Sequence, residues 1–153
     1  DMDYLDSIKS CVNEKLKGPN FDIHLTLLGP FMSMDNEKIN KIKKICTKLK
    51  PIEIFASRYA MTNNFFTSFF IEVKKSTTLI NFRNELHSSA NKNQFTTFSP
   101  HISLTYGNFP RKEKNIIKND LGALKMKFIL NKICVVNVNE DKFSWKIIKT
   151  FVL

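Results

Sequence analysis

The sequence has 153 residues, of which 42% are hydrophobic and 25% are charged. This length and composition predict one globular domain with its own core, and they exclude a disordered or fibrous chain. Lys and Arg number 24 against 14 Asp and Glu, so the formal net charge is +10. Such a charge attracts polyanions, including nucleic acids and phosphorylated ligands. The same net charge is equally expected if the lysines only solvate the surface. The charge therefore supports a polyanionic partner only in combination with other features of the sequence.

Several classes of protein are not indicated by the sequence. No apolar stretch approaches the roughly 18 residues that span a bilayer, and no signal-peptide pattern opens the chain. The three cysteines, Cys11, Cys46 and Cys134, form neither a CxxC pair nor a zinc-ligand spacing. We therefore expect a cytoplasmic monomer with one domain over residues 1–153, without membrane contact, metal or other cofactor.

The first part of the chain predicts a helix, a strand and a second helix. Apolar residues recur at spacings of three and four across residues 3–17, and Gly18-Pro19 ends this helix. Phe21–Leu28 alternates apolar and other residues, which is the pattern of a strand with one buried face. Asp35 is a suitable N-cap for a further helix, which Pro51 terminates.

The rest of the chain predicts further strands and helices. Runs of β-branched and aromatic residues indicate strands, and apolar residues at spacings of three and four indicate helices. In chain order, we expect strands Ile52–Tyr59 and Phe65–Val73 as a hairpin around Thr62-Asn63-Asn64, a helix at 76–90, a strand at Pro100–Tyr106, a helix at 112–119, and strands Lys125–Val138 and Phe143–Val152 around the turn Asn139-Glu140-Asp141.

One pattern occurs twice along the chain, each time in a predicted strand that a glycine ends. His24-Leu25-Thr26-Leu27 and His101-Ile102-Ser103-Leu104 share the order histidine, apolar residue, hydroxyl residue, apolar residue. Side chains two positions apart in a strand lie on the same face. His24 and Thr26 therefore share a face, as do His101 and Ser103. The third histidine of the chain, His87, lies in a predicted helix outside this pattern.

Two such strands side by side present two imidazoles and two hydroxyls to one groove. Imidazole, with a pKa of about 6.5, both accepts and donates a proton near neutrality. On a phosphodiester bound in this groove, one histidine would remove a proton from water or a ribose hydroxyl, and the other would protonate the departing oxygen. The two hydroxyls would donate hydrogen bonds to the non-bridging phosphate oxygens. A lone histidine in a strand is usually only a satisfied polar residue, but two in one pattern favour a shared functional groove.

At these residues the sequence resembles the two-histidine (2H) phosphoesterase superfamily, and within it the cyclic phosphodiesterase and RNA-ligase-like branch. The two histidines stand 77 positions apart (101 minus 24), and Ser144–Phe151 is similar to the last strand of that branch. The resemblance implies an α+β, bilobal fold with pseudo-twofold symmetry, in which two antiparallel sheets flank a central cleft and helices lie outside. Family members usually begin with a strand before the first helix, so that strand is either missing here or replaced by another segment.

The resemblance also implies a function and site residues. It implies a metal-independent phosphodiesterase that opens a 2′,3′-cyclic phosphate, or the 1″,2″-cyclic phosphate of ADP-ribose, to a monoester. His24 and His101 are then the acid and base, while Thr26, Ser103 and Tyr106 bind the substrate, a nucleotide or RNA. Strict alternation would point Tyr106 away from His101, so its role requires a twist or bulge at the end of the strand.

Other functions remain compatible with the same motifs. They are the cleavage of 2′,5′- or 3′,5′-linked oligonucleotides, the processing of RNA ends, and the binding of RNA ends without catalysis. Oligonucleotide bases need aromatic surfaces on which to stack. Seven phenylalanines provide such surfaces or belong to the core: Phe65, Phe66, Phe69, Phe70, Phe95, Phe98 and Phe109.

Overall fold

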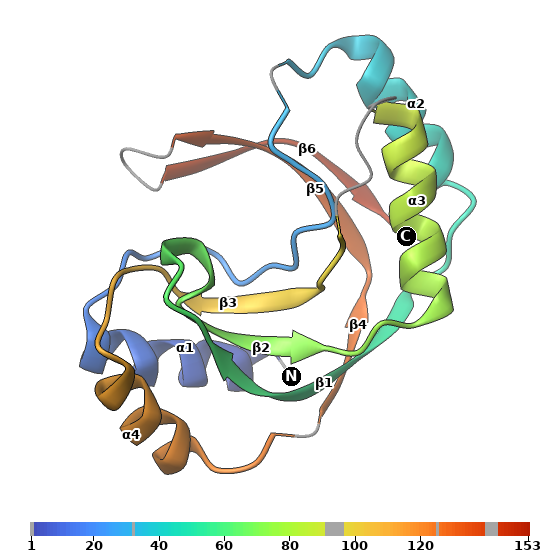
Figure 1. Ribbon diagram of the computed structural model, residues 1–153. Coiled ribbons are helices and arrows are strands. Elements are labelled where there is room, and N and C mark those ends of the chain that lie inside the picture. The colour runs from blue at the N-terminus through green and yellow to red at the C-terminus, as the bar shows by residue number, and fades with distance from the viewer. Residues whose placement is uncertain (1, 32, 91–96, 125, 140–143) are drawn as a thin grey trace.

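The computed structural model describes residues 2–31, 33–90, 97–124, 126–139 and 144–153. The chain contains both helices and antiparallel strands, as expected for the α+β class (Figure 1). The elements are α1 (Met2–Leu16), α2 (Asn36–Cys46), β1 (Ile52–Met61), the 3₁₀ turn η1 (Phe65–Thr67), β2 (Phe69–Val73), α3 (Thr77–Ala90), β3 (His101–Thr105), α4 (Arg111–Leu121), β4 (Met126–Leu130), β5 (Lys132–Asn139) and β6 (Ser144–Val152). In the described part of the chain, no helix is long and apolar enough to cross a bilayer.

The strands of the described residues form two antiparallel sheets. The larger sheet has the order β3-β2-β1-β4, and the smaller one pairs β5 with β6. The expected hairpin of β1 and β2 is confirmed, and it places β3, which carries the second histidine motif, at the edge of the larger sheet. Figure 1 shows the β5–β6 pair lying apart from β3 across the segment that carries the first motif.

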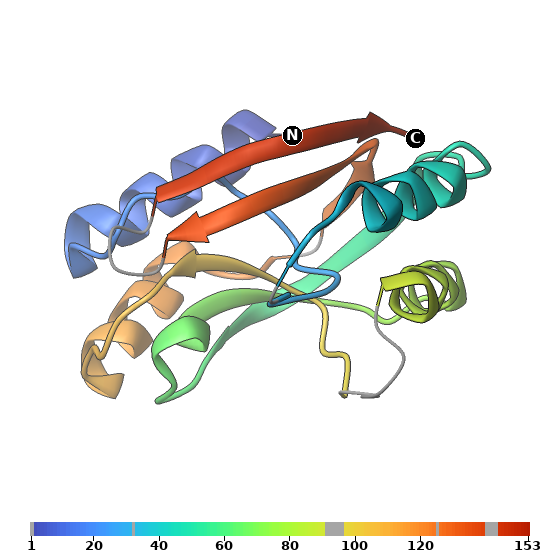
Figure 2. The same ribbon diagram turned by 90° about the horizontal axis from the view of Figure 1, so that it is seen from above.

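The helices pack in pairs that mix the two halves of the chain. Helix α1 lies beside α4, where Lys15 and Asp120 form an ion pair of 2.6 Å, and α2 packs against α3 (Figures 1 and 2). Helix α1 precedes the first histidine motif and α2 follows it, whereas α3 precedes the second motif and α4 follows it. Each motif therefore connects a helix of one pair with a helix of the other pair. This exchange is the arrangement that the expected pseudo-twofold symmetry requires.

The core is built from the inward faces of these elements. Helix α1 buries Leu5, Ile8, Val12 and Leu16, the residues whose spacing predicted the helix. Asp35 caps α2 by accepting a hydrogen bond from the backbone of Lys38, which confirms the predicted start of that helix. The fully buried side chains that join the larger sheet to the helices include Phe69, Ile71, Leu79, Phe82, Leu104 and Ile117.

The prediction of a strand at Phe21–Leu28 is wrong. The segment makes a single β-bridge, between Leu25 and Ile102, and no continuous ladder. Ile23, Leu25 and Leu27 nevertheless pack against the core. Alternating burial on one side is sufficient to produce the sequence pattern of a strand, and it does not require repeated backbone pairing.

Two other boundaries differ from the prediction. The single strand predicted at Lys125–Val138 is divided at Asn131, because β4 pairs with β1 in the larger sheet while β5 pairs with β6 in the smaller one. Phe65 begins a 3₁₀ turn rather than a strand, since the Asn64 side chain caps it. Of the predicted turn at 139–141, residues 140 and 141 lie outside the described residues.

Gly18 allows the link after α1 to lie against the end of β3. A Cβ atom at this position would overlap the Thr105 hydroxyl and lie 3.1 Å from the Tyr106 carbonyl oxygen. We predict that Gly18→Ala lowers the free energy of unfolding by about 1–3 kcal/mol, because the added methyl group would overlap the fully buried Thr105 side chain. Urea unfolding measures the change. The control Glu14→Ala, on the exposed face of α1, is expected to change stability by less than about 0.5 kcal/mol, and equal stabilities of the two variants would contradict the close contact.

Candidate active site

The bridge between Leu25 and Ile102 brings the two histidine motifs side by side in antiparallel directions. In an antiparallel pair, the residue before one partner lies across from the residue after the other. Continuing the register by one position therefore places His24 across from Ser103, and Thr26 across from His101. Residues directly opposite each other have Cβ atoms roughly 4.5–5.5 Å apart. The four predicted motif residues thus occupy neighbouring positions.

Both imidazole rings are oriented by the same local contact. Nδ1 of His24 lies 2.6 Å from the carbonyl oxygen of Asp22, and Nδ1 of His101 lies 2.8 Å from that of Ser99. A carbonyl oxygen only accepts hydrogen bonds, so Nδ1 carries the proton in each ring. In the neutral rings this leaves the Nε2 lone pair to accept a proton. The contact spans two residues in both motifs, which fixes both tautomers in the same way.

Burial favours the neutral form of the His24 ring. The main effect is the loss of hydration, which lowers the pKa of His24 below that of an ordinary imidazole. The nearby charges of His101 and Lys9 lower this pKa further, whereas the hydrogen bond to the Asp22 carbonyl and the Asp22 carboxylate oppose the shift. The two histidines are therefore close enough for the charge of one to affect the other. At neutral pH, His24 is a proton acceptor.

Strand β3 contains a bulge inside the second motif. Phe70 pairs with Ser103, but the preceding residue of β2, Phe69, pairs with Thr105. One additional residue, Leu104, therefore lies on β3 at this point. Because a bulge changes the face to which the following side chains point, the end of β3 no longer follows strict alternation.

This bulge brings Tyr106 to the histidines. The Tyr106 hydroxyl lies 3.5 Å from Nε2 of His24, a long contact, and it has a hydrogen bond with the Ser103 side chain. Burial raises the pKa of Tyr106, although the bond with Ser103 partly opposes this, so the phenol is protonated at neutral pH. The bulge on which the prediction for Tyr106 depended is present, and a role in substrate binding stays a prediction.

Aromatic rings surround His24 from both halves of the molecule. Tyr106 stacks on Phe21 with ring centroids 4.3 Å apart, and Trp145 of β6 meets the His24 ring edge-on at 4.2 Å. Phe21 also lies 5.9 Å from Trp145. Phe21 also contacts Lys9, whose Nζ atom is 4.6 Å from the ring centroid. His24 therefore lies in a largely apolar surrounding, which accounts for its dehydration.

The two hydroxyl residues of the motifs differ in exposure. Thr26 is exposed, whereas Ser103 is only 4% exposed and is occupied by its contact with Tyr106. In the second motif, the ring of His101 packs edge-on against the ring of Phe70 in β2, with the two ring centroids 5.2 Å apart. Among the described residues, no group of three His, Cys, Asp or Glu side chains is placed to hold a metal ion.

Two histidine motifs on adjacent antiparallel segments, flanked by two sheets, are the arrangement expected of a 2H phosphoesterase. The family model of the 2′-5′ RNA ligase superfamily, a group of 2H phosphoesterases, matches residues 7–142. The chain belongs to this superfamily, which confirms the family inferred from the motifs. No curated protein matches the sequence.

Solved structures of low sequence identity share the fold. TT0787 of Thermus thermophilus has 13% identity and a TM-score of 0.65, over 99% of this chain and 91% of that one. LigT of E. coli in complex with 3′-AMP has 14% identity and a TM-score of 0.56, over 96% and 90% of the two chains. A structure described as a phosphoesterase has 12% identity and a TM-score of 0.56, over 96% and 92%. The expected 2H phosphoesterase fold is thereby confirmed.

Sequence reasoning missed several residues around His24. Phe21, Lys9 and Trp145 were assigned no role, although each contacts or lies close to the candidate site. Trp145 is the single tryptophan of the chain and starts the closing strand, which is a signal that was visible in the sequence. Lys9 and Phe21 gave no such signal, because their proximity depends on how α1 packs against the first motif.

The lowered pKa of His24 is directly measurable. We predict that the His24 ring titrates below the ordinary value of about 6.5, and that Trp145→Ala moves this pKa upward by admitting water to the ring. Histidine ring signals followed by NMR over a pH series report both values. Ile129→Ala, an exposed change on β4 in the other sheet, is the control and is expected to leave the titration unchanged. A His24 pKa at or above the ordinary value would contradict the described burial.

Proposed function

We propose that this protein is a phosphodiesterase that opens a nucleoside 2′,3′-cyclic phosphate to a monoester. The observation that carries the proposal is the common geometry of the two histidines, each with Nδ1 directed to a backbone carbonyl and Nε2 left for the substrate. General acid–base catalysis needs one group that accepts a proton and one that donates it in the same step. A pair of imidazoles meets both needs.

His24 is the general base in this proposal. Its lowered pKa keeps the ring neutral near pH 7, and its Nδ1 proton is held by the Asp22 carbonyl. Nε2, whose contact with the Tyr106 hydroxyl is long at 3.5 Å, then takes a proton from a water molecule as the water oxygen bonds to phosphorus. The aromatic rings of Phe21 and Trp145 exclude other water from the ring, which favours the neutral form before the reaction.

His101 is the general acid in this proposal. As an imidazolium, it donates its Nε2 proton to the ribose oxygen whose bond to phosphorus breaks, and Ser99 accepts the hydrogen bond from Nδ1 throughout. The products are a phosphate monoester and a free ribose hydroxyl. Thr26 and Ser103 donate hydrogen bonds to the non-bridging phosphate oxygens, where negative charge increases in the transition state. Ser103 does so by exchanging its contact with Tyr106 for one with the substrate.

A second candidate function is the cleavage or end processing of an oligonucleotide. The formal charge of +10 favours a polyanion longer than one nucleotide, and LigT of E. coli, which shares the fold, has been crystallised with 3′-AMP and with ATP. The ADP-ribose 1″,2″-cyclic phosphate and a binding module without turnover are further alternatives. All of them use the same pair of motifs, so direct comparison of substrates distinguishes them.

The proposal predicts loss of turnover when either histidine is removed. We expect His24→Ala and His101→Ala each to lower kcat/KM for 2′,3′-cyclic AMP by at least about 10²-fold, the usual contribution of a positioned acid or base. The double variant should be little worse than either single variant, because the two rings act in one step. Rates are measured in EDTA, with thermal unfolding of each variant as a check of folding. Lys44→Gln, an exposed change on α2, is the control.

The same assay includes a 2′,5′-linked triadenylate. Turnover of the cyclic nucleotide alone supports the proposed function, whereas turnover of the triadenylate favours oligonucleotide cleavage. Turnover that survives in the double variant would exclude the two histidines as the acid and base. Turnover that disappears in EDTA would exclude the metal-independent reaction.

A further inference from the structure

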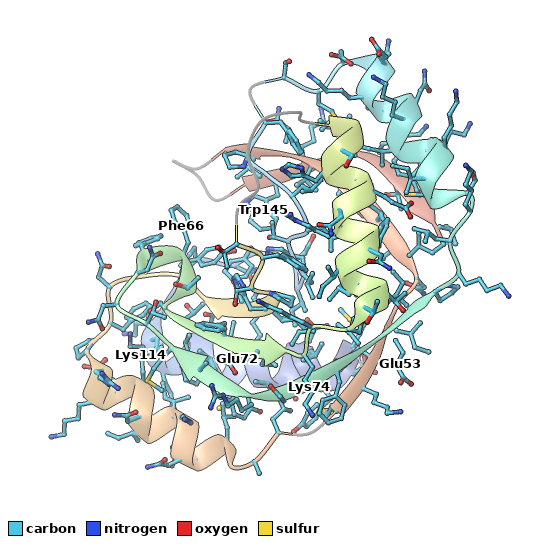
Figure 3. The ribbon with its side chains drawn as sticks, turned by 45° about the vertical axis from the view of Figure 1, so that its right-hand side comes forward. Glu53, Phe66, Glu72, Lys74, Lys114 and Trp145 are labelled. Carbon is cyan, nitrogen blue, oxygen red and sulfur yellow. The ribbon has the colours of Figure 1, made fainter. Side chains whose placement is uncertain are left out.

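The 3₁₀ turn between β1 and β2 exposes an aromatic ring near the candidate site. Phe66 is 48% exposed, while Tyr106, which its ring meets edge-on at 5.6 Å, is buried. A large apolar side chain at a hairpin tip gains little from this exposure in the free protein. In Figure 3, Phe66 stands at the end of the hairpin on the side that faces the β5–β6 sheet and Trp145.

The hairpin tip that carries Phe66 is held by local hydrogen bonds. The backbone N–H of Phe66 donates to the Asn64 side chain at 2.9 Å, and that of Asn64 donates to the Thr62 hydroxyl at 3.1 Å. The Thr62 hydroxyl also donates to the carbonyl oxygen of Thr67 at 2.8 Å. These bonds close the turn on both sides of Phe66. The ring therefore projects from a fixed backbone.

The rest of the molecule also supports this tip. The backbone N–H of Gly107, the residue after Tyr106, donates to the Phe65 carbonyl at 3.0 Å. Lys114 of α4 is only 1% exposed, and its Nζ atom donates to the Thr62 carbonyl at 2.6 Å. Figure 3 shows Lys114 between α4 and the hairpin. A buried ammonium without a partner would be costly, so this bond favours the observed position of the tip.

The ring of Phe66 extends the aromatic surface around His24. Phe66 contacts Tyr106, Tyr106 stacks on Phe21, and Phe21 lies against His24 at 5.8 Å. Phe66 is the exposed end of this series, and His24 is its reactive end. A ligand whose phosphate lies at the histidines and whose planar group lies on Phe66 would cover the exposed end of this series, while Tyr106 and Phe21 remain buried beneath it.

We propose that Phe66 is a stacking platform for the nucleobase of the substrate. This inference rests on the proposed function and specifies its substrate class as nucleoside phosphates rather than cyclic phosphates without a base. Stacking on a phenyl ring uses the π-face that every base has, so it provides affinity without selecting one base. The platform is rigid before binding, which reduces the conformational entropy lost when the base is bound.

The proposal is tested with a substrate that has a base and one that lacks it. Phe66→Ala is expected to raise KM for 2′,3′-cyclic AMP by about tenfold, the effect of losing one base–aromatic stack, with less than a twofold change in kcat. For methyl riboside 2,3-cyclic phosphate, which has no base, KM should change by less than twofold. Phe66→Trp should retain the affinity for the nucleotide, and Ile116→Ala, an equally exposed apolar side chain on α4, serves as the control.

Two results would overturn the platform. Equal losses on both substrates would mean that Phe66 only supports the local structure, and unchanged KM for the nucleotide would mean that the base lies elsewhere. If the wild type turns over neither substrate, the proposed reaction fails separately from the platform. In that case the binding of 3′-AMP is measured through the fluorescence of Trp145, the single tryptophan. Weaker binding by Phe66→Ala but not by Ile116→Ala supports the platform. Equal binding by the wild type, Phe66→Ala and Ile116→Ala rejects it.

Discussion

A single backbone pairing, between Leu25 and Ile102, determines how the two halves of the site meet. Its antiparallel register places each histidine across from the hydroxyl residue of the other motif. A shift by one residue would turn the His24 side chain to the opposite side, because side chains alternate along extended backbone. One bridge is sufficient here, since Ile23, Leu25 and Leu27 also anchor the segment in the core. The apolar positions of the first motif thus hold its register while the polar positions face the site.

Much of this site was predictable from the sequence because it depends on local patterns. The spacing of His24 and Thr26, and of His101 and Ser103, identified the family that the comparison with known proteins confirms. The helices were predicted because their apolar residues follow the helical period, and Asp35 supplied a cap with a clear local signal. These features depend on residues within a few positions of each other.

Other features depend on contacts between distant parts of the chain, and the sequence did not indicate them. The sequence of residues 125–138 predicts one strand and does not indicate that the chain leaves one sheet and joins the other at Asn131. The bulge at Leu104 became visible only from the pairing of β3 with β2, although the prediction for Tyr106 required one. Likewise, Trp145 reaches His24 only through the placement of the β5–β6 sheet. The aromatic surrounding of His24, and with it the lowered pKa of this ring, therefore had to be found in the structure.

The central claim is that His24 and His101 act on one phosphodiester, and NMR of the two histidine rings during titration with 3′-AMP tests it most directly. Both Nε2 atoms then lie beside the same phosphate group, so the account predicts that the ring signals of His24 and His101 shift together with one common midpoint. The signal of His87, which lies in α3 outside the motifs, should remain in place. A shift of one motif histidine alone, or two different midpoints, would contradict a shared phosphate site.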